Sequence, residues 1–554
     1  MRAAWGCEVV GLLRIKRILL AIPALLALLL GSTLFFVSVR AQPGLNQLTI
    51  SSIGDASFLN PVLAQDSASS EVNGLVFNGL LKYDRDLKKL VGDLAENWEV
   101  RAGEYPQITF HLRHGVRWHD GAPFTADDVV FTYERIMDPK TNTVRRSDFE
   151  LVQSCEVLDP YTVRVTYKEP FSPGLETWGI GIIPAHLLRG QDINTAAFNS
   201  HPVGTGPFRF NHWMSDERIV LDANPDYWEG RPHLERIVIR IIPETSLSEI
   251  ELLTGGIDYY GIEPHQYARL SADHSLEVFE QPSLGYSYIG WNLKNPLFQD
   301  VRVRRALAMA VNREEIVRYV LYGLGRVATG PFPYHMWYAN PNVRPLPHDV
   351  EGARRLLAEA GWKPGPDGIL TKDGQRFSFS LITNSGNDLR RDVGVLVQRQ
   401  LAQIGIEVKL ELYEWSVFLK DFIMPRHFDA TILGWSLGVD PDCYSIFHSS
   451  QIKDGFNVTG YSNPEADALM VAGRREYDRE ARKEIYWRLN EVIANDQPYC
   501  FLFVPESTAA LRRRFALLET ADGRKRLVPI TISKAGLMYD IVKWKVVRSP
   551  ELTP

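Results

Sequence analysis

The chain has 554 residues, of which 45% are hydrophobic and 23% charged, an ordinary composition for a globular protein. Residues 1–41 hold five of the 61 Lys and Arg residues and one of the 67 Asp and Glu residues, which leaves 56 basic and 66 acidic residues and a formal charge of −10. A chain this acidic lacks the broad positive surface that nucleic-acid binding requires, and its length suffices for two or three domains.

An apolar run from Ile18 to Val39 follows a basic flank at residues 14–17. This layout, with small residues at its exit, is typical of a secretory signal that is cleaved after Ala41. The run also approaches the roughly 20 residues that span a bilayer, so an uncleaved anchor stays open as an alternative. We predict that residues 1–41 are a signal peptide or N-terminal membrane anchor. The rest of the chain is then periplasmic or lies on the extracytoplasmic face of the membrane.

Strands and helices are predicted in turn after this segment. Leu48 to Ser52 is predicted to be a strand. The next helix is expected to carry on one face the apolar residues Val72, Leu75, Val76 and Leu80. A further helix is predicted from Ala126 to Met137, with Thr125 as its N-cap.

The pattern between residues 208 and 260 predicts strands around a single helix. The strands are expected at Phe208–Trp213, Arg218–Leu221, Leu234–Ile242 and Ile257–Tyr260. The helix is expected from Glu244 to Leu253, before Gly255. Because strand, helix and strand follow one another with short connections, we expect a parallel βαβ unit.

A second α/β region is predicted after Asp349, which caps a helix that ends at Gly361. Asp373–Gly374 is a strong turn signal. The strands that follow are expected at Phe377–Thr383, Ile406–Leu412 and Phe428–Leu433, and the helices at Leu389–Ile404 and Ser416–Ile423. Ligands of open α/β sheets bind outside the carboxyl ends of the strands. The residues at these ends are Asn384, Ser385, Gly386, Tyr413, Glu414, Trp415, Gly434, Trp435 and Ser436.

The two Trp residues at these strand ends have two interpretations. For Trp415 or Trp435 alone, packing in the core is the commoner role. Two Trp residues at equivalent strand ends make the wall of a ligand cleft an equally good interpretation.

Five stretches of the chain resemble one family, the family 5 extracellular solute-binding proteins, which are the dipeptide, oligopeptide and nickel receptors of ABC importers. They are LAENWEVRAGEYPQITFHLRHGVRWHDGAPFTADDVVFTYERI from Leu94, GTGPFRF from Gly204, ANPDYWEGRPHLERIVIRIIP from Ala223, YSYIGWNLKNPLFQDVRVRRALAMAVNREEIV from Tyr286, and GWSLGVDPDCYSIFHS from Gly434. The resemblance runs from about Leu48 to beyond Pro505.

The resemblance implies an α/β fold with two lobes, a type II periplasmic binding protein of the Venus-flytrap kind with an extra subdomain in the first lobe. Two crossover segments and closure around the ligand by hinge bending are expected. The implied parts are 42–75, 204–281 and 499–554 for lobe I, 76–203 for its extra subdomain, and 282–498 for lobe II.

The resemblance also implies the residues of the ligand site. Trp415 and Trp435 match positions that wall the peptide cavity, and Asp55 to Phe58 resembles the strip of lobe I that pairs with a ligand backbone by strand addition. The predicted ligand-binding residues are Trp435, Trp415, Ser436, Gly438, Asn384, Ser385, Phe58, Asp55 and Tyr286.

Two charged groups of the family's dipeptide site have no counterpart here. Peptide-binding members carry an Asp three residues after the second Trp, where it holds the ligand α-ammonium, and this chain has Gly438. The loop at residues 383–387 also lacks the Arg that holds the ligand carboxylate, and Arg390 and Arg391 are expected on the next helix. Because a buried charge without a partner is costly, the ligand is either a longer peptide held by backbone groups or a neutral solute such as a glycan.

We therefore predict a monomeric substrate-binding protein that captures peptides or peptide-like solutes and delivers them to the membrane permease of an ABC importer. The alternatives are a membrane-anchored solute receptor or sensor, and a binder of oligosaccharide or of a metal chelate. The chain contains no HExxH, GxSxG or GxxxxGK[ST] motif, so we expect no enzymatic activity and no cofactor.

The histidines and cysteines carry weaker signals. His111, His114 and His119 are spaced like metal ligands, but the alternation of a strand would not place all three on one face, so no metal site is predicted. The cysteines after the signal segment are odd in number, which leaves a disulfide open without naming a pair. They are Cys155, Cys443 and Cys500.

Overall fold

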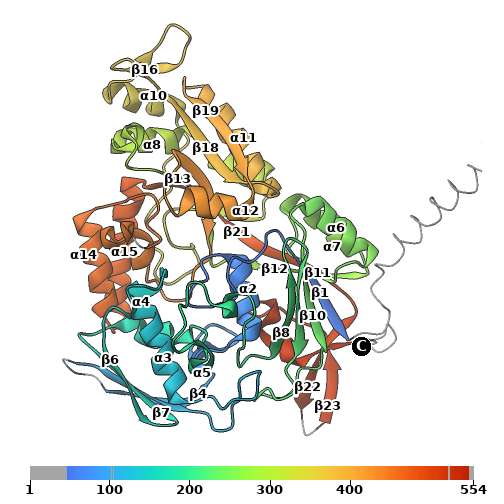
Figure 1. Ribbon diagram of the computed structural model, residues 1–554. Helices are drawn as coiled ribbons and strands as arrows, with labels where there is room; N and C mark the ends of the chain where they lie inside the picture. The colour runs from blue at the N-terminus through green and yellow to red at the C-terminus, as the bar shows by residue number, and fades with distance from the viewer. Residues whose placement is uncertain (1–45, 102, 104, 454, 522–523, 548–554) are drawn as a thin grey trace, which may run out of the picture.

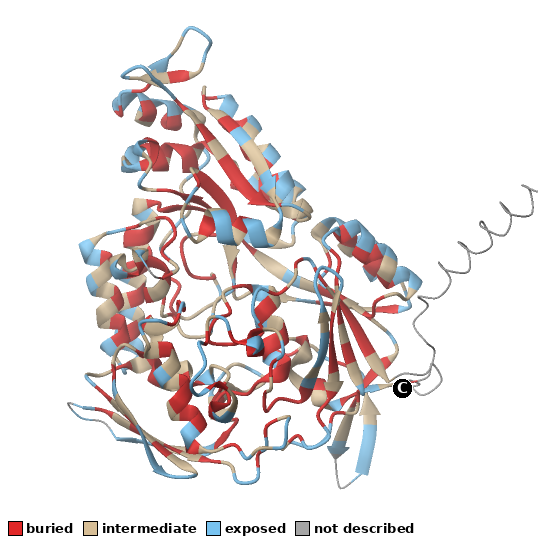
Figure 2. Cartoon of the chain, viewed as in Figure 1, coloured by how far each residue is buried: buried red, intermediate tan, exposed pale blue. Residues whose placement is uncertain are grey.

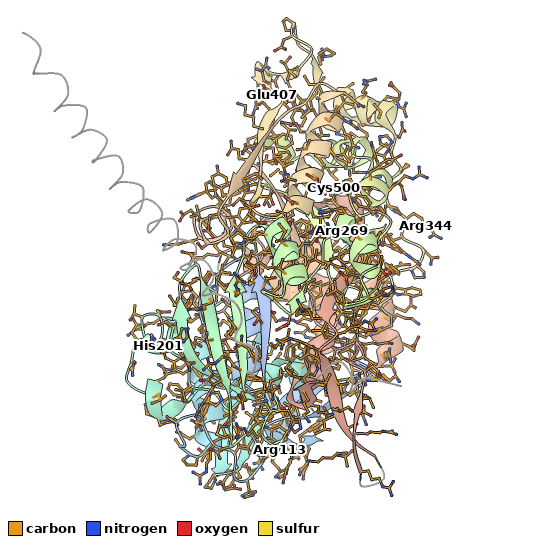
Figure 3. All side chains as sticks on the ribbon, turned by 90° about the vertical axis from the view of Figure 1, so that its right-hand side faces the viewer. Arg113, His201, Arg269, Arg344, Glu407 and Cys500 are labelled. Atoms are coloured by element: carbon orange, nitrogen blue, oxygen red, sulfur yellow. The ribbon has the colours of Figure 1, made fainter. Side chains whose placement is uncertain are left out.

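The computed structural model describes residues 46–101, 103, 105–453, 455–521 and 524–547. Their backbone forms two lobes, one above the other in Figure 1. Figure 3 shows the same long axis from the side, with Glu407 near one end and Arg113 near the other. The predicted signal or anchor segment lies outside the described residues. Within the described ranges, no helix combines the length and the apolar character needed to cross a membrane.

Twelve strands of the described residues form one mixed sheet that extends through both lobes. They are β1 (Gln47–Ser52), β8 (Phe208–Met214), β9 (Arg218–Ala223), β10 (Arg236–Ile241), β11 (Tyr259–Tyr260), β12 (Leu276–Pro282), β13 (Tyr286–Trp291), β14 (Gly325–Val327), β18 (Ser378–Asn384), β19 (Glu407–Tyr413), β20 (Ala430–Trp435) and β21 (Tyr499–Arg512). The main path follows the order β19-β18-β20-β13-β21-β11-β1-β10-β9-β8, and β12 and β14 also pair with β21.

Smaller sheets complete the strand inventory of the described residues. A four-stranded antiparallel sheet, in the order β4-β5-β7-β6, lies at the lower end of Figure 1. Its strands are β4 (Ala95–Arg101), β5 (Gln107–Leu112), β6 (Val152–Asp159) and β7 (Thr162–Tyr167). The others are β2 (Leu81–Tyr83) with β3 (Leu90–Gly92), β15 (Lys363–Pro364) with β16 (Leu370–Lys372) and β17 (Gln375–Arg376), and β22 (Phe515–Ala521) with β23 (Arg524–Val528) and β24 (Trp544–Val546).

The α-helices of the described residues are distributed over both lobes. They are α2 (Ser67–Val76), α3 (Ala126–Met137), α4 (Arg146–Phe149), α5 (Ala185–Leu188), α6 (Thr245–Thr254), α7 (Tyr267–Ser271), α8 (Val301–Ala310), α9 (Arg313–Tyr319), α10 (Val350–Glu359), α11 (Asp388–Ala402), α12 (Trp415–Val417), α13 (Tyr444–Phe447), α14 (Pro464–Arg475) and α15 (Arg479–Asp496). Tighter or wider helical turns are η1 (Ser172–Gly179), η2 (Ala197–Asn199), η3 (Pro264–Gln266), η4 (Pro296–Phe298), η5 (Phe418–Ile423), η6 (Ser449–Ile452) and η7 (Leu537–Lys543).

Buried side chains gather in separate clusters, visible as red ribbon in both halves of Figure 2. We call lobe I the part built around the clusters that contain Leu48 and Tyr260. Lobe II is the part built around the clusters that contain Ile289 and Tyr288. Phe110 of the four-stranded sheet belongs to the same cluster as Leu48, so this extra subdomain shares its core with lobe I.

The long strand β21 connects the two lobes. Its first residues pair with β13 and β14, and its last residues pair with β11 and β12. Side chains from Tyr499 to Val504 are buried in lobe II, whereas Ala509 and Leu511 are buried in lobe I. The Ser283 N–H, in the connection from β12 to β13, donates to the Pro505 carbonyl at 3.1 Å. The lobes therefore join at two adjacent segments, and β21 enters lobe I several residues after position 499.

The predicted parallel units are confirmed. β10 and β11 both pair in parallel with β1, which lies between them, and α6 connects them. α6 ends at Gly255, whose φ of 85° is a left-handed value that glycine adopts readily. In lobe II, β18 pairs in parallel with both β19 and β20, so the three strand ends do meet at one edge.

Caps and turns also agree with the sequence in several places. Thr125 and Asp128 form a capping box at the start of α3, and the Asp349 carboxylate accepts from the third N–H of α10. Asp373 has a φ of 51° in the tight turn between β16 and β17. One prediction is wrong: α2 stops at Val76 and does not reach Leu80, whose N–H donates instead to the Trp178 carbonyl at 2.7 Å.

Candidate ligand-binding site

Two adjoining hollows lie between the lobes. The smaller has a volume of about 560 Å³, and we call it the α2 hollow because α2 lines it with Ser70, Asn73 and Gly74. The larger has a volume of about 990 Å³, and we call it the Trp337 hollow after the aromatic ring in its wall. Each volume is in the range of small-molecule sites. Both hollows are lined by Tyr83, Glu176, Leu284, Val439 and Asp440, so residues of both lobes form their shared wall.

α2 is held firmly at both ends. Its N-cap Asp66 accepts hydrogen bonds from the Ser69 N–H at 2.8 Å and from the Ser69 hydroxyl at 2.7 Å. At the other end, a Cβ on Gly204 would lie 1.9 Å from the Val76 carbonyl oxygen. The GTGPF stretch therefore needs glycine for the backbone to approach α2 this closely. This support fixes the position of Asn73 in the wall.

η1 forms a second part of the lobe I wall and carries Glu176. Trp178 anchors η1, because its Nε1 donates to the Tyr167 hydroxyl at 3.1 Å in the core. The Tyr83 hydroxyl donates to the Glu176 carboxyl. Burial raises the pKa of Glu176 to about 8, and the negative charge of Asp440 adds to that rise.

The lobe II wall is the loop after β20, residues 436–442. Asp440 accepts from both terminal nitrogens of Arg482, at 2.5 and 2.8 Å. Asp442 accepts from the Nε of Arg474 at 3.0 Å. Both arginine side chains are less than a tenth exposed, so these pairs hold the loop on α14 and α15 from inside.

Two of the predicted site residues line the hollows. Ser436 lies in the wall of the Trp337 hollow and Gly438 in the wall of the α2 hollow. A Cβ built on Gly438 meets no heavy atom within 4 Å. A side chain at position 438 would therefore have room in the hollow.

Trp435 lies directly before this loop, on an aromatic layer. β13 and β20 pair Tyr286 with Trp435 in their ladder. The Trp435 ring is stacked on Tyr288, with 6.4 Å between centroids and 12° between planes, and Phe456 meets it edge-on at 5.4 Å. Tyr286 is only 2% exposed, and its hydroxyl has no hydrogen-bond partner in the described part of the chain. Tyr286 thus belongs to the buried layer, and Trp435 is its half-buried outer member.

Trp415 lies where the lobes touch. A Cβ on Gly54 of lobe I would be 2.9 Å from a carbon of the Trp415 ring. On the lobe II side, the Arg390 guanidinium lies 5.9 Å from the ring centroid and donates to Asn384 Oδ1 at 2.7 Å. Ser385, the next residue, is exposed. Arg390 is in the first turn of α11, as predicted, and its partner is the strand-end Asn384.

The lobe I strip at residues 55–58 has its polar groups engaged within the protein. The Asp55 carboxylate accepts from Trp213 Nε1 at 2.9 Å and from the Asp216 N–H at 2.9 Å, both near the turn between β8 and β9. The Phe58 N–H donates to the Ser69 hydroxyl at 3.1 Å, while its ring is 37% exposed. In this arrangement Asp55 fixes a turn, and strand addition at the strip stays a prediction.

Direct contacts join the lobes on both sides of the hollows. On the α14 side, Arg475 forms a two-pronged pair with Glu169. On the α6 side, the Thr245 hydroxyl donates to the Asp388 carboxylate at 3.1 Å. α14 and α6 lie at opposite flanks of the molecule in Figure 1. The structure therefore has its lobes closed on each other.

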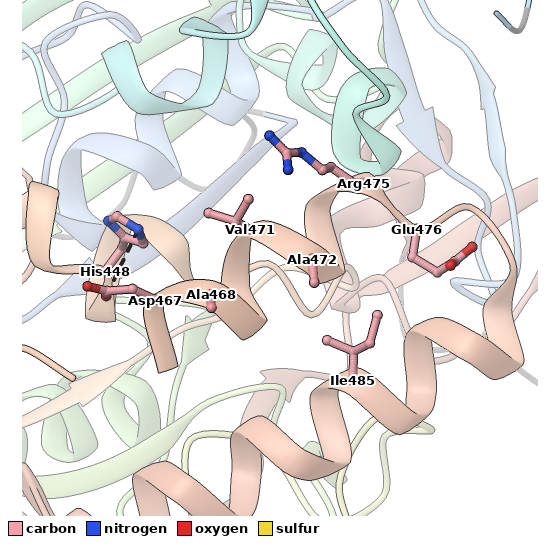
Figure 4. Close-up of a pocket in the computed structure, with 8 residues that line it drawn as sticks. All are labelled: His448, Asp467, Ala468, Val471, Ala472, Arg475, Glu476 and Ile485. Atoms are coloured by element: carbon pink, nitrogen blue, oxygen red, sulfur yellow. Dashed lines mark ion pairs between the residues drawn. The ribbon is translucent and has the colours of Figure 1, made fainter. Parts of the chain in front are cut away.

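A separate hollow of about 570 Å³ lies on α14 and α15 (Figure 4). Its apolar lining includes Val471 and Ile485. Its charged side chains already have partners: Arg475 pairs with Glu169 and Asp467 accepts from the Ser449 hydroxyl. Because those groups are engaged, this hollow is a weaker candidate than the interlobe space.

The histidines and cysteines have structural surroundings. His119 donates from Nε2 to the Gly206 carbonyl at 3.0 Å and accepts at Nδ1 from the Gly204 N–H, and burial lowers its pKa to about 4. In the described ranges, no group of three His, Cys, Asp or Glu side chains is placed to hold a metal ion. Free thiols are found at Cys155, Cys443 and Cys500. Figure 3 labels Cys500, which is buried in lobe II.

The family model of bacterial extracellular solute-binding proteins, family 5, matches residues 89–455. The chain belongs to this family. The oligopeptide-binding protein AppA of Bacillus subtilis (strain 168) is 37% identical to it over 517 residues, which are 91% of this chain and 92% of AppA.

Solved structures of family 5 proteins have the same fold. The structure of AppA from Bacillus subtilis in complex with a nonapeptide superposes with a TM-score of 0.85 at 36% identity, and covers 91% of this chain and 99% of AppA. NikZ from Campylobacter jejuni in complex with Ni(L-His) has a TM-score of 0.81 at 28% identity, with 90% and 99% covered. The two-lobed α/β fold expected from the sequence is confirmed.

Three residues that line the hollows were not predicted from the sequence: Asn73, Glu176 and Trp337. Asn73 had a signal, since it is a polar residue beside Val72, on the face of α2 that carries the apolar residues Val72 and Val76. Glu176 and Trp337 belong to segments with no regular hydrophobic period, so only tertiary contacts place them.

Proposed function

We propose that this protein is the substrate-binding component of an ABC importer that captures peptides of several residues, or peptide-like solutes, between its lobes. The observation that carries the proposal is the pair of adjoining hollows whose shared wall comes from both lobes. Their combined extent suits an elongated ligand better than a single small molecule. The AppA structure, which contains a nonapeptide, supports the peptide assignment.

Capture would follow from hinge bending. The two adjacent connections at Ser283 and Pro505 are the pivot, and the ligand binds the closed form better because only that form presents both walls. We propose lobe bounds of 42–75, 204–281 and residues after Pro505 for lobe I, 76–203 for the subdomain, and 282–505 for lobe II. The closed monomer then delivers its ligand to the membrane permease, without turning it over.

Export is part of the proposal. Residues 1–41 direct the chain across the membrane, and the mature protein begins at Gln42. Amino-terminal sequencing of the protein from the membrane and the extracytoplasmic fraction tests this. A start at Gln42 supports a released receptor, while Met1 in the membrane fraction would favour the anchored receptor.

Binding is tested by native mass spectrometry of the protein as purified, followed by thermal unfolding with candidate ligands. We expect retained peptides in the first measurement. In the second, random peptide pools should raise the melting temperature by mass action, while Ni(L-His) complexes and oligosaccharides should not. A melting shift produced only by nickel chelate or only by sugar would overturn the peptide assignment.

A further inference from the structure

The carboxyl groups of the α2 hollow differ in how their charges are compensated. Two of the four form an ion pair with a buried arginine, Asp440 with Arg482 and Asp442 with Arg474, and the third, Asp148, feels the positive charges of Arg145 and Arg474. Glu176 is the fourth, and it forms no ion pair with any described residue. Its hydrogen-bond donor is the Tyr83 hydroxyl, which is neutral. The positive charge that acts on Glu176 is that of Arg482, which is already paired with Asp440, so Glu176 has no arginine of its own.

Asn73 is a second polar group of this hollow without a partner. Its side chain is 7% exposed, and neither Oδ1 nor Nδ2 has a hydrogen bond to any described residue. A buried amide in this state is costly, and folded proteins rarely leave one unsatisfied. Asn73 and Glu176 line the same hollow, so one ligand can satisfy both.

On the lobe II side of the α2 hollow, Gly438 offers no charged group to a ligand. It lines the α2 hollow from lobe II and contributes no side chain, and a Cβ there would meet open space. The lobe II loop thus leaves a gap in this hollow. The unpaired carboxyl is on η1, in the opposite wall.

We propose that Glu176 binds a positively charged ammonium group of the ligand, and that Asn73 binds a neighbouring polar group of the same ligand. The inference rests on the proposed function, because it names the chemistry of a ligand in the α2 hollow. The Tyr83 hydroxyl orients the carboxyl, and lobe I thereby supplies the charge recognition. The ammonium is either the amino terminus of a peptide or a lysine side chain, which share this chemistry.

Protonation of the Glu176 carboxyl makes the affinity for an ammonium ligand depend on pH, which gives a second measurement. The titratable and charged groups that act on Glu176 are Tyr83, Asp440, Asp442 and Arg482. Since the pKa of Glu176 is raised to about 8, chiefly by burial, the empty site holds a protonated carboxyl at pH 6. A bound ammonium favours the ionised form, so binding releases a proton. Affinity for an ammonium ligand should therefore rise by about tenfold or more between pH 6 and pH 7.5.

The test uses three random hexapeptide pools, with ligand capture read by native mass spectrometry and affinity by calorimetry. One pool has free amino termini and no lysine, one is N-acetylated without lysine, and one is N-acetylated with a single lysine. We expect the acetylated pool without lysine to bind about tenfold or more weakly than at least one of the others. The preferred pool identifies which ammonium is bound. If no pool binds, the proposed function fails, and this inference fails with it.

Glu176→Gln removes the charge and keeps the shape of the side chain. It should abolish the preference for ammonium-containing pools and flatten the pH dependence between pH 6 and pH 7.5. Glu134→Gln is the matched control, because Glu134 is an exposed residue of α3 outside the hollow and loses the same charge. If all pools bind with equal affinity to wild type and to Glu176→Gln, the inference is overturned while the proposed function stands.

Asn73→Leu separates a ligand role from a structural one. Replacing a buried amide that has no partner should leave the empty protein as stable as before, or raise its melting temperature. Affinity for the preferred pool should nevertheless fall about fivefold or more. A lower melting temperature together with unchanged affinity would show that Asn73 serves only the fold, and would remove it from the site.

Discussion

The two walls of the interlobe space are built in different ways. The lobe II wall includes the loop after β20, at the edge of the sheet where the parallel strands β18, β19 and β20 end. The lobe I wall is assembled from α2 (Ser67–Val76) and η1 (Ser172–Gly179), which are distant in the chain and are joined by backbone hydrogen bonds just after α2, such as that from Leu80 to Trp178. The first wall has aromatic rings on a rigid layer and paired carboxylates. The second has an unpaired carboxyl and an unpaired amide.

The two lobes therefore offer different kinds of contact to a ligand. Lobe II offers shape and apolar area, since Trp435 rests on stacked tyrosines and Asp440 is neutralised by Arg482. Lobe I offers Glu176, whose hydrogen-bond donor is the neutral Tyr83 hydroxyl, and Asn73, whose amide has no hydrogen-bond partner among the described residues. A ligand that bridges the two walls gains apolar contact from one and charge recognition from the other. Four substitutions test whether lobe II supplies the apolar contact and lobe I the charge recognition.

Arg482→Met should have the largest effect, and on stability. The substitution leaves Asp440 buried without its cation, which costs about 3–5 kcal/mol of unfolding free energy. Urea unfolding followed by circular dichroism measures it. The control is Arg488→Met on the same helix, whose exposed pairs with Glu465 and Glu491 are worth less than about 1 kcal/mol. Equal losses for both variants would mean that the buried pair does not hold the lobe II wall.

Trp435→Ala should weaken peptide binding by about 2 kcal/mol, or roughly 30-fold, because an aromatic ring is removed directly beside the loop that lines the hollows. Calorimetry with the preferred peptide pool measures the change. Trp435→Phe, which retains a ring on Tyr288, should recover most of the affinity. Trp228→Ala, in lobe I and in contact with Arg113, serves as the control for the loss of a tryptophan elsewhere. Unchanged affinity in Trp435→Ala would assign Trp435 to packing alone.

Gly438→Asp should move charge recognition onto the lobe II wall. The side chain enters open space, and the new carboxylate should improve binding of peptides with free amino termini by about tenfold relative to acetylated ones. Gly438→Asn, of the same size without the charge, is the control. If neither variant changes the ratio between the two peptide pools, Gly438 does not face the ligand amino terminus.

Arg475→Ala should have the smallest effect, and on closure. Arg475 is half-exposed where it pairs with Glu169 across the lobes, so its loss is worth less than about 1 kcal/mol. We expect a fall in ligand affinity of less than about fivefold and a slightly larger radius of gyration of the empty protein by small-angle X-ray scattering. Arg354→Ala, an exposed pair within lobe II, should change neither quantity. A fall in affinity of more than tenfold would mean that the Arg475–Glu169 pair is the main contact that stabilises the closed form.

Local signals in the sequence predicted much of the backbone. Thr125 as a cap, Gly255 as a helix end and Asp373–Gly374 as a turn are each decided within a few residues, because the backbone groups they serve are neighbours in the chain. The failure at Leu80 is also local in origin. Its apolar spacing fits a helix, but its N–H is satisfied by Trp178, almost one hundred residues away.

Two of the nine predicted site residues line the hollows, and ligand binding by the nine stays a prediction. Ser436 and Gly438 follow β20 at the edge where parallel strands end together, which is a property of the sheet and not of distant contacts. Asp55 was also singled out, yet its carboxylate is engaged by Trp213 and Asp216, a partnership that hydrophobic patterning does not reveal.

By itself the sequence determined the two α/β regions and membership of a solute-binding family. These depend on periodicity and on motifs contiguous in the chain. The tertiary structure alone decided which carboxyl is unpaired. Asp440 and Glu176 are similar groups in the sequence, but α15 brings Arg482 into an ion pair with Asp440, while Glu176 forms no ion pair with a described residue. Charge compensation depends on which distant segments meet, and the local signals of the sequence do not determine that.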